Sequence, residues 1–192
     1  QAQAHIFPTD PRAIFAEALA EGAVTAVKQT FQQFFTPPDL ARRMVDCADL
    51  QFHDRVLEPS AGTGVLLDAI LRRAAASDGI TIEAKEHDAG LAHRLALAYP
   101  DVPVRCIDFL SMSPTPYFDA VLMNPPWGKT TRRQTTVMMP FKPSDIADGF
   151  IFRAMEVLKD GGRLVAILPE HILEGSPALA WLKKNHTLRA VI

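Results

Sequence analysis

The stretch of this sequence best suited to chemistry is Asn124-Pro125-Pro126-Trp127, which follows the apolar run DAVLM. A proline fixes its own φ angle and restricts the residue before it, so the Asn124 side chain and the Pro125 carbonyl are held rigidly. Two hydrogen-bond acceptors are thereby fixed at the end of a predicted strand. A purely structural interpretation, with the prolines as chain breakers and Trp127 as a half-buried anchor, does not explain the polar asparagine.

A second stretch, LEPSAGTG at residues 57–64, is typical of a strand that ends in an acid and turns tightly into a helix. Gly62 and Gly64 permit the turn and let backbone N–H groups approach a ligand closely. Two glycines in this spacing are a weak signal alone, because many strand-to-helix turns contain them. A dinucleotide-binding loop would carry a third glycine where this chain has Leu67, which argues against a nicotinamide enzyme.

Two further strand ends carry acids. Glu86 ends the run ITIEAKE about twenty residues after the glycine loop, where this kind of fold places an acid on a pair of ribose hydroxyls. Asp108 and Phe109 follow the run VPVRCI and supply a carboxylate and an apolar ring, which can bond the amino group of an adenine and pack against its face. Each acid alone is typical of a solvated surface, but acids at successive strand ends indicate a binding site.

The elements that must position these residues alternate between short β-rich runs and longer amphipathic helical stretches. This alternation predicts an α/β fold with a doubly wound, mostly parallel sheet and helices on both faces. Strands are expected at RVLEP, ITIEAKE, VPVRCI, DAVLM and RLVAILP, and helices over 65–75, 89–99, 145–159 and 177–184. The first and fourth of these strands should be neighbours where the strand order reverses, so the glycine loop and NPPW should flank one crevice.

The remaining segments complete the expected organisation. Residues 1–34 are expected to form an N-terminal helical segment, with helical spacing over 11–28, and residues 35–192 the main domain. Gly161 and Gly162 should stop the helix before them. The polar stretch after NPPWG has no periodicity and predicts a mobile loop. The chain stops inside a new apolar run, LRAVI, and we expect a truncated C-terminus.

In this order, FFTPP, LEPSAGTG, Glu86, Asp108-Phe109 and NPPW resemble the AdoMet-dependent DNA methyltransferases that methylate amino groups, in the class where the glycine motif precedes the catalytic one. The resemblance covers nearly the whole chain. It implies a Rossmann-like class I fold, S-adenosyl-L-methionine (AdoMet) as cofactor and the N6 amino group of adenine in DNA as methyl acceptor. Signatures like NPPW also occur in methyltransferases of protein glutamine and of RNA guanine, and the FFTPP segment favours DNA adenine.

The resemblance also implies a cofactor site. Thr36-Pro37 would lie against the methionine part of AdoMet, Glu58 and the backbone of 60–62 would hold its amino acid moiety, and Glu86 would take the ribose hydroxyls. His87 stands where the family usually has an apolar residue that covers the adenine, and its imidazole can still stack there. The implied cofactor residues are Thr36, Pro37, Glu58, Pro59, Ser60, Ala61, Gly62, Gly64, Glu86, His87, Asp108, Phe109 and Asn124.

The implied mechanism follows from the chemistry of the target. An aromatic amine is a poor nucleophile because its lone pair is delocalised into the ring. The Asn124 side-chain oxygen and the Pro125 carbonyl would accept the two amino hydrogens and aim the lone pair at the sulfonium methyl. The base must flip out of the duplex, and Trp127 is expected to stack on it. The catalytic residues implied are Asn124, Pro125, Pro126 and Trp127, and neither cysteine follows a proline at a strand end as cytosine-C5 methylation requires.

Charge and composition limit how the chain meets its partners. A formal net charge of −2 gives no global attraction to nucleic acid, so DNA contacts must be local or come from another domain or subunit. Lys129, Arg132 and Arg133 are the predicted phosphate contacts, and a solvated loop explains them equally well. The sequence has no apolar run of the ~20 residues that cross a bilayer, no signal-peptide pattern and no zinc-type cysteine spacing, so we expect a cytoplasmic protein without metal or membrane partner.

Three functions stay open on the sequence. The leading interpretation is an adenine-specific DNA methyltransferase, with restriction–modification as one possible role. A second enzyme would use the same site to methylate protein glutamine or RNA guanine. A third protein, of another class, would be an AdoMet-binding module of a larger DNA-processing protein with no activity alone. The intact NPPW sequence argues against loss of activity.

Overall fold

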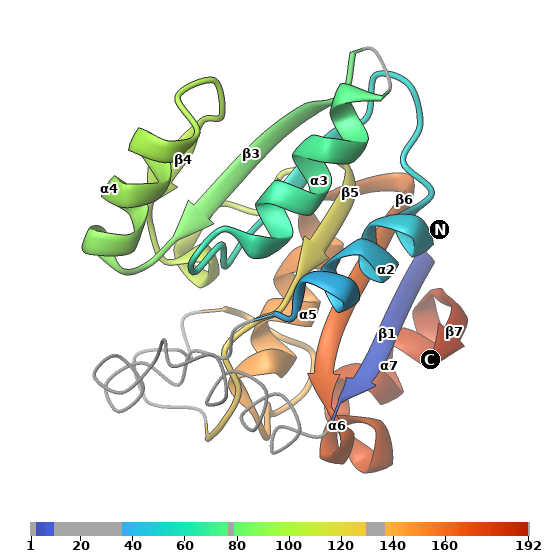
Figure 1. Ribbon diagram of the computed structural model, residues 1–192. Helices are drawn as coiled ribbons and strands as arrows, with labels where there is room; N and C mark the ends of the chain where they lie inside the picture. The colour runs from blue at the N-terminus through green and yellow to red at the C-terminus, as the bar shows by residue number, and fades with distance from the viewer. Residues whose placement is uncertain (1–2, 10–35, 77–78, 130–136, 192) are drawn as a thin grey trace.

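The computed structural model describes residues 3–9, 36–76, 79–129 and 137–191, which build one seven-stranded sheet (Figure 1). The strands are β1 (Gln3–Thr9), β2 (Arg55–Glu58), β3 (Thr81–Glu86), β4 (Val104–Cys106), β5 (Phe118–Met123), β6 (Leu158–Pro169) and β7 (Thr187–Val191). Their order is β4-β3-β2-β5-β6-β1-β7, and every hydrogen-bonded pair is parallel. The predicted doubly wound α/β fold is confirmed.

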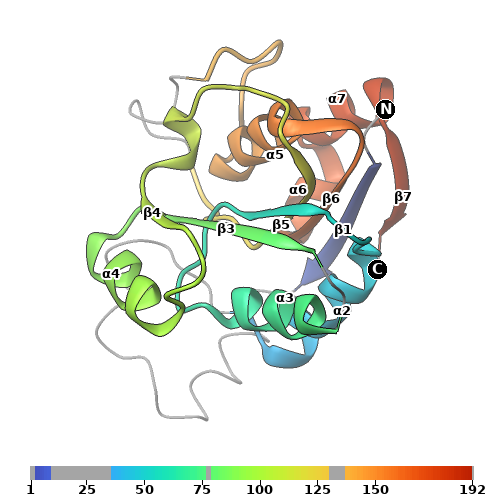
Figure 2. The same ribbon diagram turned by 90° about the horizontal axis from the view of Figure 1, so that it is seen from above.

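Helices cover both faces of the sheet (Figure 2). They are α2 (Pro38–Ala48), α3 (Val65–Ala75), α4 (Ala89–Ala98), α5 (Ile146–Val157), α6 (Glu170–Gly175) and α7 (Pro177–Asn185), with a short 3-10 turn η1 (Phe109–Ser111). Helices α2, α3 and α4 lie on one face, and α5 and α7 on the other. Side-chain caps fix where three of them begin: Asp88 accepts from Leu91 N at 2.8 Å for α4, Asp145 forms a capping box with Asp148 for α5, and Ser176 accepts from Leu179 N for α7.

The strand order reverses between β2 and β5, as predicted. These strands pair through Val56↔Ala120 and Leu57↔Val121, so their carboxyl ends meet at one edge of the sheet. The glycine loop leaves β2 at this edge and NPPW leaves β5 beside it. In an open parallel sheet the crevice at such a reversal is where ligands bind.

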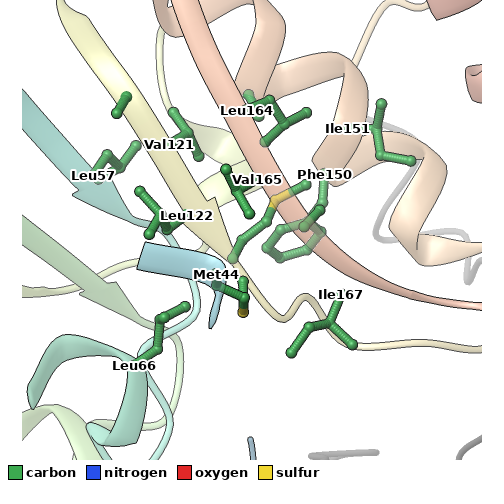
Figure 3. Close-up of a cluster of buried hydrophobic side chains, with 14 of the residues drawn as sticks. Met44, Leu57, Leu66, Val121, Leu122, Phe150, Ile151, Leu164, Val165 and Ile167 are labelled. Carbon is green, nitrogen blue, oxygen red and sulfur yellow. The ribbon is translucent and has the colours of Figure 1, made fainter. Parts of the chain in front are cut away.

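Strands β5 and β6 form the centre of the core. Leu122 and Val165 are fully buried, because helices on both faces exclude water from the sheet. Figure 3 places Met44 of α2 on one side of these strands and Phe150 and Ile151 of α5 on the other. The NPPW turn therefore leaves the sheet from a strand at the centre of the core.

The N-terminus differs from the expectation of a helical segment over residues 1–34. Residues 3–9 form β1, which pairs in parallel with β6 and with β7 inside the same sheet. The helical expectation rested on alanine-rich spacing over 11–28, and residues 10–35 lie outside the described part of the chain. The QAHIFPT stretch has no helical spacing of its own, and pairing with β6 decides its conformation.

The predicted helix over 145–159 ends at Val157, and the two glycines do not stop it. Leu158 is already extended, with φ −79° and ψ 139°, and pairs with Phe118 of β5. The register between β5 and β6 then shifts before the pair Ala120↔Arg163. Gly161 adopts φ +80° within this irregularity, so the glycines accommodate a bulge in β6.

None of the described helices is long and apolar enough to cross a membrane. Over the same part of the chain, no group of three or more histidine, cysteine, aspartate or glutamate side chains is arranged to hold a metal ion.

Candidate functional site

The glycine loop after β2 turns as its sequence predicts. Gly62 and Gly64 both take positive φ angles, 55° and 90°, which glycine adopts without strain. Ala61 N donates to the Lys85 carbonyl at 2.9 Å, which ties the loop to the end of β3. A side chain at Gly64 would meet the Leu95 side chain at 2.8 Å, so Gly64 also permits close packing against α4. The loop is therefore held in place before any ligand arrives.

Glu86 fixes the glycine loop from the end of β3. Its side chain is 4% exposed, and its two oxygens accept hydrogen bonds from Gly62 N at 2.7 Å and Asp88 N at 2.8 Å. The sequence predicted the proximity of Glu86 to the loop but not the direct bond to Gly62. Each carboxylate oxygen can accept a second hydrogen bond, so capacity for hydroxyl donors remains.

Glu58, at the end of β2, is a buried acid of a different kind. It is 2% exposed, and its Oε2 has no hydrogen-bond partner among the described residues. Burial raises the pKa of the Glu58 carboxyl well above its ordinary value, and the negative charge of Glu86 raises it further. A cationic or hydrogen-bond-donating ligand group would relieve this cost, so Glu58 is suited to such a group.

The predicted adenine-binding residues are only partly available. Asp108 caps η1 by accepting from Leu110 N at 3.0 Å, and it stays half-exposed after β4. His87 is exposed at the end of β3. Phe109 differs from the prediction: it is 1% exposed, and its ring packs on Phe150 with 5.4 Å between centroids. Phe109 therefore faces the core, because α5 covers this side of the sheet, and its ring is not presented to an adenine.

Asn124 lies where the glycine loop and the start of α2 meet. Its Nδ2 donates to Thr36 Oγ1 at 3.1 Å, and its backbone oxygen accepts from Ser60 Oγ at 3.1 Å. Thr36 is 8% exposed, and Pro37 next to it occupies the N-cap position of α2. The predicted Thr-Pro segment, glycine loop and NPPW turn thus converge on one asparagine. The predicted loop residue Pro59 is buried.

The residues after Asn124 differ in exposure. Pro125 is buried and Pro126 is half-buried. Trp127 is 5% exposed and belongs to the main buried cluster, whereas the sequence predicted an accessible ring that stacks on the target base. A ring must offer a face to stack, so in this structure Trp127 packs the turn onto the core. The large apolar surface of the indole explains the difference, because it is buried in the main hydrophobic cluster.

Of the predicted phosphate contacts, the structure describes Lys129 but not the two arginines. Lys129 is exposed just beyond the NPPW turn. Arg132 and Arg133 lie outside the described residues, and their role stays a prediction.

Two functional-site neighbours were not predicted. Asp145 accepts hydrogen bonds from Gly128 N and lies 3.1 Å from His171 Nε2, so it connects the NPPW turn to α5 and α6. The sequence signal for Asp145 was its place before an apolar helical run, which indicates an N-cap. His171 has no recognisable ligand spacing in the sequence. Its contact with Asp145 depends on the placement of β6, which no local pattern reveals.

A family model and a curated protein are similar to this chain in sequence. The model of the Eco57I restriction-modification methylase family matches residues 99–192, which contain the NPPW turn. The type II methyltransferase M.TthHB8I of Thermus thermophilus is 30% identical over 160 residues, covering 76% of this chain and 36% of that protein. The chain spans about a third of the length of the curated type II methyltransferases it matches.

Solved structures share the fold. A type I restriction-modification system methyltransferase subunit from Streptococcus thermophilus aligns with a TM-score of 0.60 and 23% identity, covering 79% of this chain and 38% of that one. A Listeria monocytogenes protein assigned to the class I S-adenosylmethionine-dependent methyltransferases aligns with a TM-score of 0.65 and 20% identity, covering 91% and 57%. The chain has the fold of class I AdoMet-dependent methyltransferases, and its residues 99–192 are similar to the Eco57I restriction-modification methylase family.

Proposed function

We propose that this chain is the catalytic core of a methyltransferase that moves a methyl group from AdoMet to the N6 amino group of adenine in DNA. The observation that carries the proposal is the contact between the two loops at the sheet reversal, where Ser60 Oγ bonds the Asn124 carbonyl at 3.1 Å. This contact brings a loop suited to a cofactor within reach of a rigid acceptor suited to an amine. DNA as the substrate also implies action in the cytoplasm.

The residues present fit AdoMet. Glu58 is a buried acid with an oxygen that has no partner among the described residues, and AdoMet carries positively charged groups. Glu86, with one lone pair on each oxygen still available, would bind the ribose hydroxyls, and Asp108 and His87 would contact the adenine. Thr36 and the loop at 60–62 would border the methionine part. When bound, AdoMet supplies a methyl group activated by its sulfonium.

Asn124 and Pro125 would prepare the acceptor. The Asn124 amide is oriented by its hydrogen bond to Thr36, which directs Nδ2 toward that hydroxyl and leaves Oδ1 on the other branch of the planar amide. Oδ1 and the Pro125 carbonyl would each accept one hydrogen of the adenine amine, so the nitrogen lone pair is freed from the ring. Formation of the carbon–nitrogen bond would break the sulfur–methyl bond of AdoMet, with S-adenosylhomocysteine as the leaving group, and leave one surplus proton on N6, which passes to solvent. Fixed acceptors of this kind act mainly on the transition state.

DNA is the proposed partner, with sequence recognition supplied by another domain or subunit. The net charge of −2 and an exposed Lys129 give this chain little electrostatic attraction of its own. Phosphate neutralisation provides most non-specific affinity for DNA, so weak binding with a shallow salt dependence is expected. A base inside a duplex cannot reach Asn124, and the proposal therefore includes flipping of the target base.

The test offers labelled AdoMet to the chain with duplex DNA, RNA and protein substrates, followed by mass spectrometry of the digested product. N6-methyladenine in DNA is the expected product. Methylated guanine in RNA or methylated glutamine in protein would instead support the alternative acceptors, and AdoMet binding without transfer would indicate a cofactor-binding module.

The matched variant is Asn124→Ala. It should lower turnover by on the order of 10²–10³-fold, which is the usual effect of removing one preorganised hydrogen-bonding group from a transition state. AdoMet affinity, measured by calorimetry, should stay within about threefold because the lost oxygen contacts the target amine. Substantial remaining activity on DNA would contradict the role given to NPPW.

A further inference from the structure

Gly128, directly after the NPPW turn, is attached to the beginning of α5 through both of its backbone polar groups. Gly128 N lies 3.1 Å and 3.0 Å from the two carboxylate oxygens of Asp145. The Gly128 carbonyl accepts from Ile146 N at 2.9 Å. The far end of the turn is thus fixed by Asp145, while the near end is fixed by the bond between Ser60 and Asn124.

Asp145 has further contacts that hold its carboxylate in place. It is 4% exposed and also accepts from Ala147 N at 2.9 Å, as the N-cap of α5. His171 Nε2, at the start of α6, lies 3.1 Å from its Oδ2. Both oxygens are occupied by groups of the protein, so Asp145 is not arranged to contact a substrate. Its geometry is suited to holding the turn in a single position.

Asp148, one helical turn further on, makes a useful contrast. It is fully buried and accepts from Ser144 N, Ser144 Oγ, Asp145 N and Ser176 Oγ. It therefore joins α5 to α7 and to the residue before the helix. Its side-chain contacts do not include Gly128 or any other part of the NPPW turn.

We propose that Asp145 is a positioning residue for methyl transfer: by holding Gly128, its carboxylate fixes the acceptor oxygens of Asn124 and Pro125 relative to the cofactor loop. This inference rests on the proposed function. The physical basis is the steep dependence of a transfer reaction on alignment, since a displacement of about 1 Å can cost on the order of 10²-fold in rate. Ground-state binding of the cofactor does not require the same alignment, because its loop is held separately by Glu86.

The variant that tests this is Asp145→Asn, with Asp148→Asn as the matched control. In Asp145→Asn an amide NH2 replaces one of the oxygens that face Gly128 N, and the turn loses part of its attachment. Turnover should fall roughly 10- to 100-fold, with AdoMet affinity and the KM for DNA within about threefold. Asp148→Asn removes a carboxylate equally buried at the same helix end. Asp148→Asn should lower the thermal unfolding temperature by at least as much as Asp145→Asn does. It should leave turnover of the folded protein within about threefold of the wild type.

A second readout does not depend on activity. The chain has two tryptophans, so Trp181→Phe leaves Trp127, which is 5% exposed, as the sole indole fluorophore. In this background Asp145→Asn should increase quenching of Trp127 by acrylamide, while Asp148→Asn should not. If the wild-type chain methylates no substrate, the proposed function fails, and the quenching comparison still tests the positioning. Equal quenching in both variants, or an equal loss of turnover in both, would overturn the proposal.

Discussion

Two pairs of buried acids lie near the cofactor loop and behind the NPPW turn, and one of the four acids differs from the others in its hydrogen bonding. Glu58 and Glu86 border the cofactor loop, and Asp145 and Asp148 lie behind the NPPW turn; all four are at most 4% exposed. Asp145 and Asp148 accept hydrogen bonds at every carboxylate oxygen. Glu58 has an oxygen without a partner among the described residues.

This difference distinguishes acids that hold the backbone from an acid that awaits a ligand. An unpaired buried carboxylate is costly, and it persists where something else offsets that cost. A carboxylate whose oxygens all accept hydrogen bonds already has the cost of its burial offset by groups of the protein. The cofactor half therefore gains stability when it is filled, whereas the target half is rigid without a ligand. Three substitutions test this contrast, and the largest effect is expected in the target half.

Trp127→Ala should lower the free energy of unfolding by about 3–5 kcal/mol, because it removes a large ring from the packed interior beneath the NPPW turn. Chemical denaturation measures the change. Phe52→Ala is the control, since that aromatic ring is 61% exposed and its loss should change stability by no more than about 0.5 kcal/mol. Unchanged stability with a raised KM for DNA would restore the stacking role that the sequence predicted.

Glu86→Ala should weaken AdoMet binding by roughly 1–3 kcal/mol, the scale of lost hydrogen bonds to a charged group, as measured by calorimetry. Two effects contribute, because the variant loses the proposed ribose contacts and also the bond that holds Gly62. Glu86→Gln keeps the shape of the side chain and one acceptor oxygen, so its AdoMet affinity should lie between those of the wild type and Glu86→Ala. If both variants bind AdoMet as the wild type does, Glu86 only completes the loop.

Glu58→Gln should have opposite effects on stability and on AdoMet affinity. Burial raises the pKa of Glu58 in the folded protein above its unfolded value. The stability linked to its proton is fully present below about pH 4 and is lost as the pH rises through the folded pKa. The glutamine variant lacks this loss, so without cofactor it should be the more stable protein at pH 7 and show no advantage near pH 4.

The same variant should bind AdoMet more weakly, because a cationic group loses its carboxylate. Thermal unfolding across pH, with and without AdoMet, measures both effects. Glu174→Gln, which changes an exposed carboxylate on α6, should alter neither. A glutamine variant that is less stable at pH 7 would mean that Glu58 already has a compensating partner in the free protein.

The two halves also differ in how far the sequence could specify them. The strands that end in Glu58 and Glu86, and the turn on Gly62 and Gly64, were predictable because each depends on a local pattern and on the regular geometry of parallel strands. The neighbouring placement of β2 and β5 followed from the same geometry. Within the target half, the prolines determined locally that the NPPW turn is stiff.

Only the tertiary structure decided what the target half contacts. Asn124 meets Thr36 across 88 positions of sequence, and Asp145 meets His171 across 26. Such contacts depend on where whole elements pack, and side-chain type alone does not encode that. The same reason explains the inward orientation of Phe109 and Trp127, whose rings suit a ligand or a core equally well. Phe109 packs on Phe150 of α5, which covers that face of the sheet, and Trp127 belongs to the same buried cluster. Burial of their apolar surface away from water favours these positions.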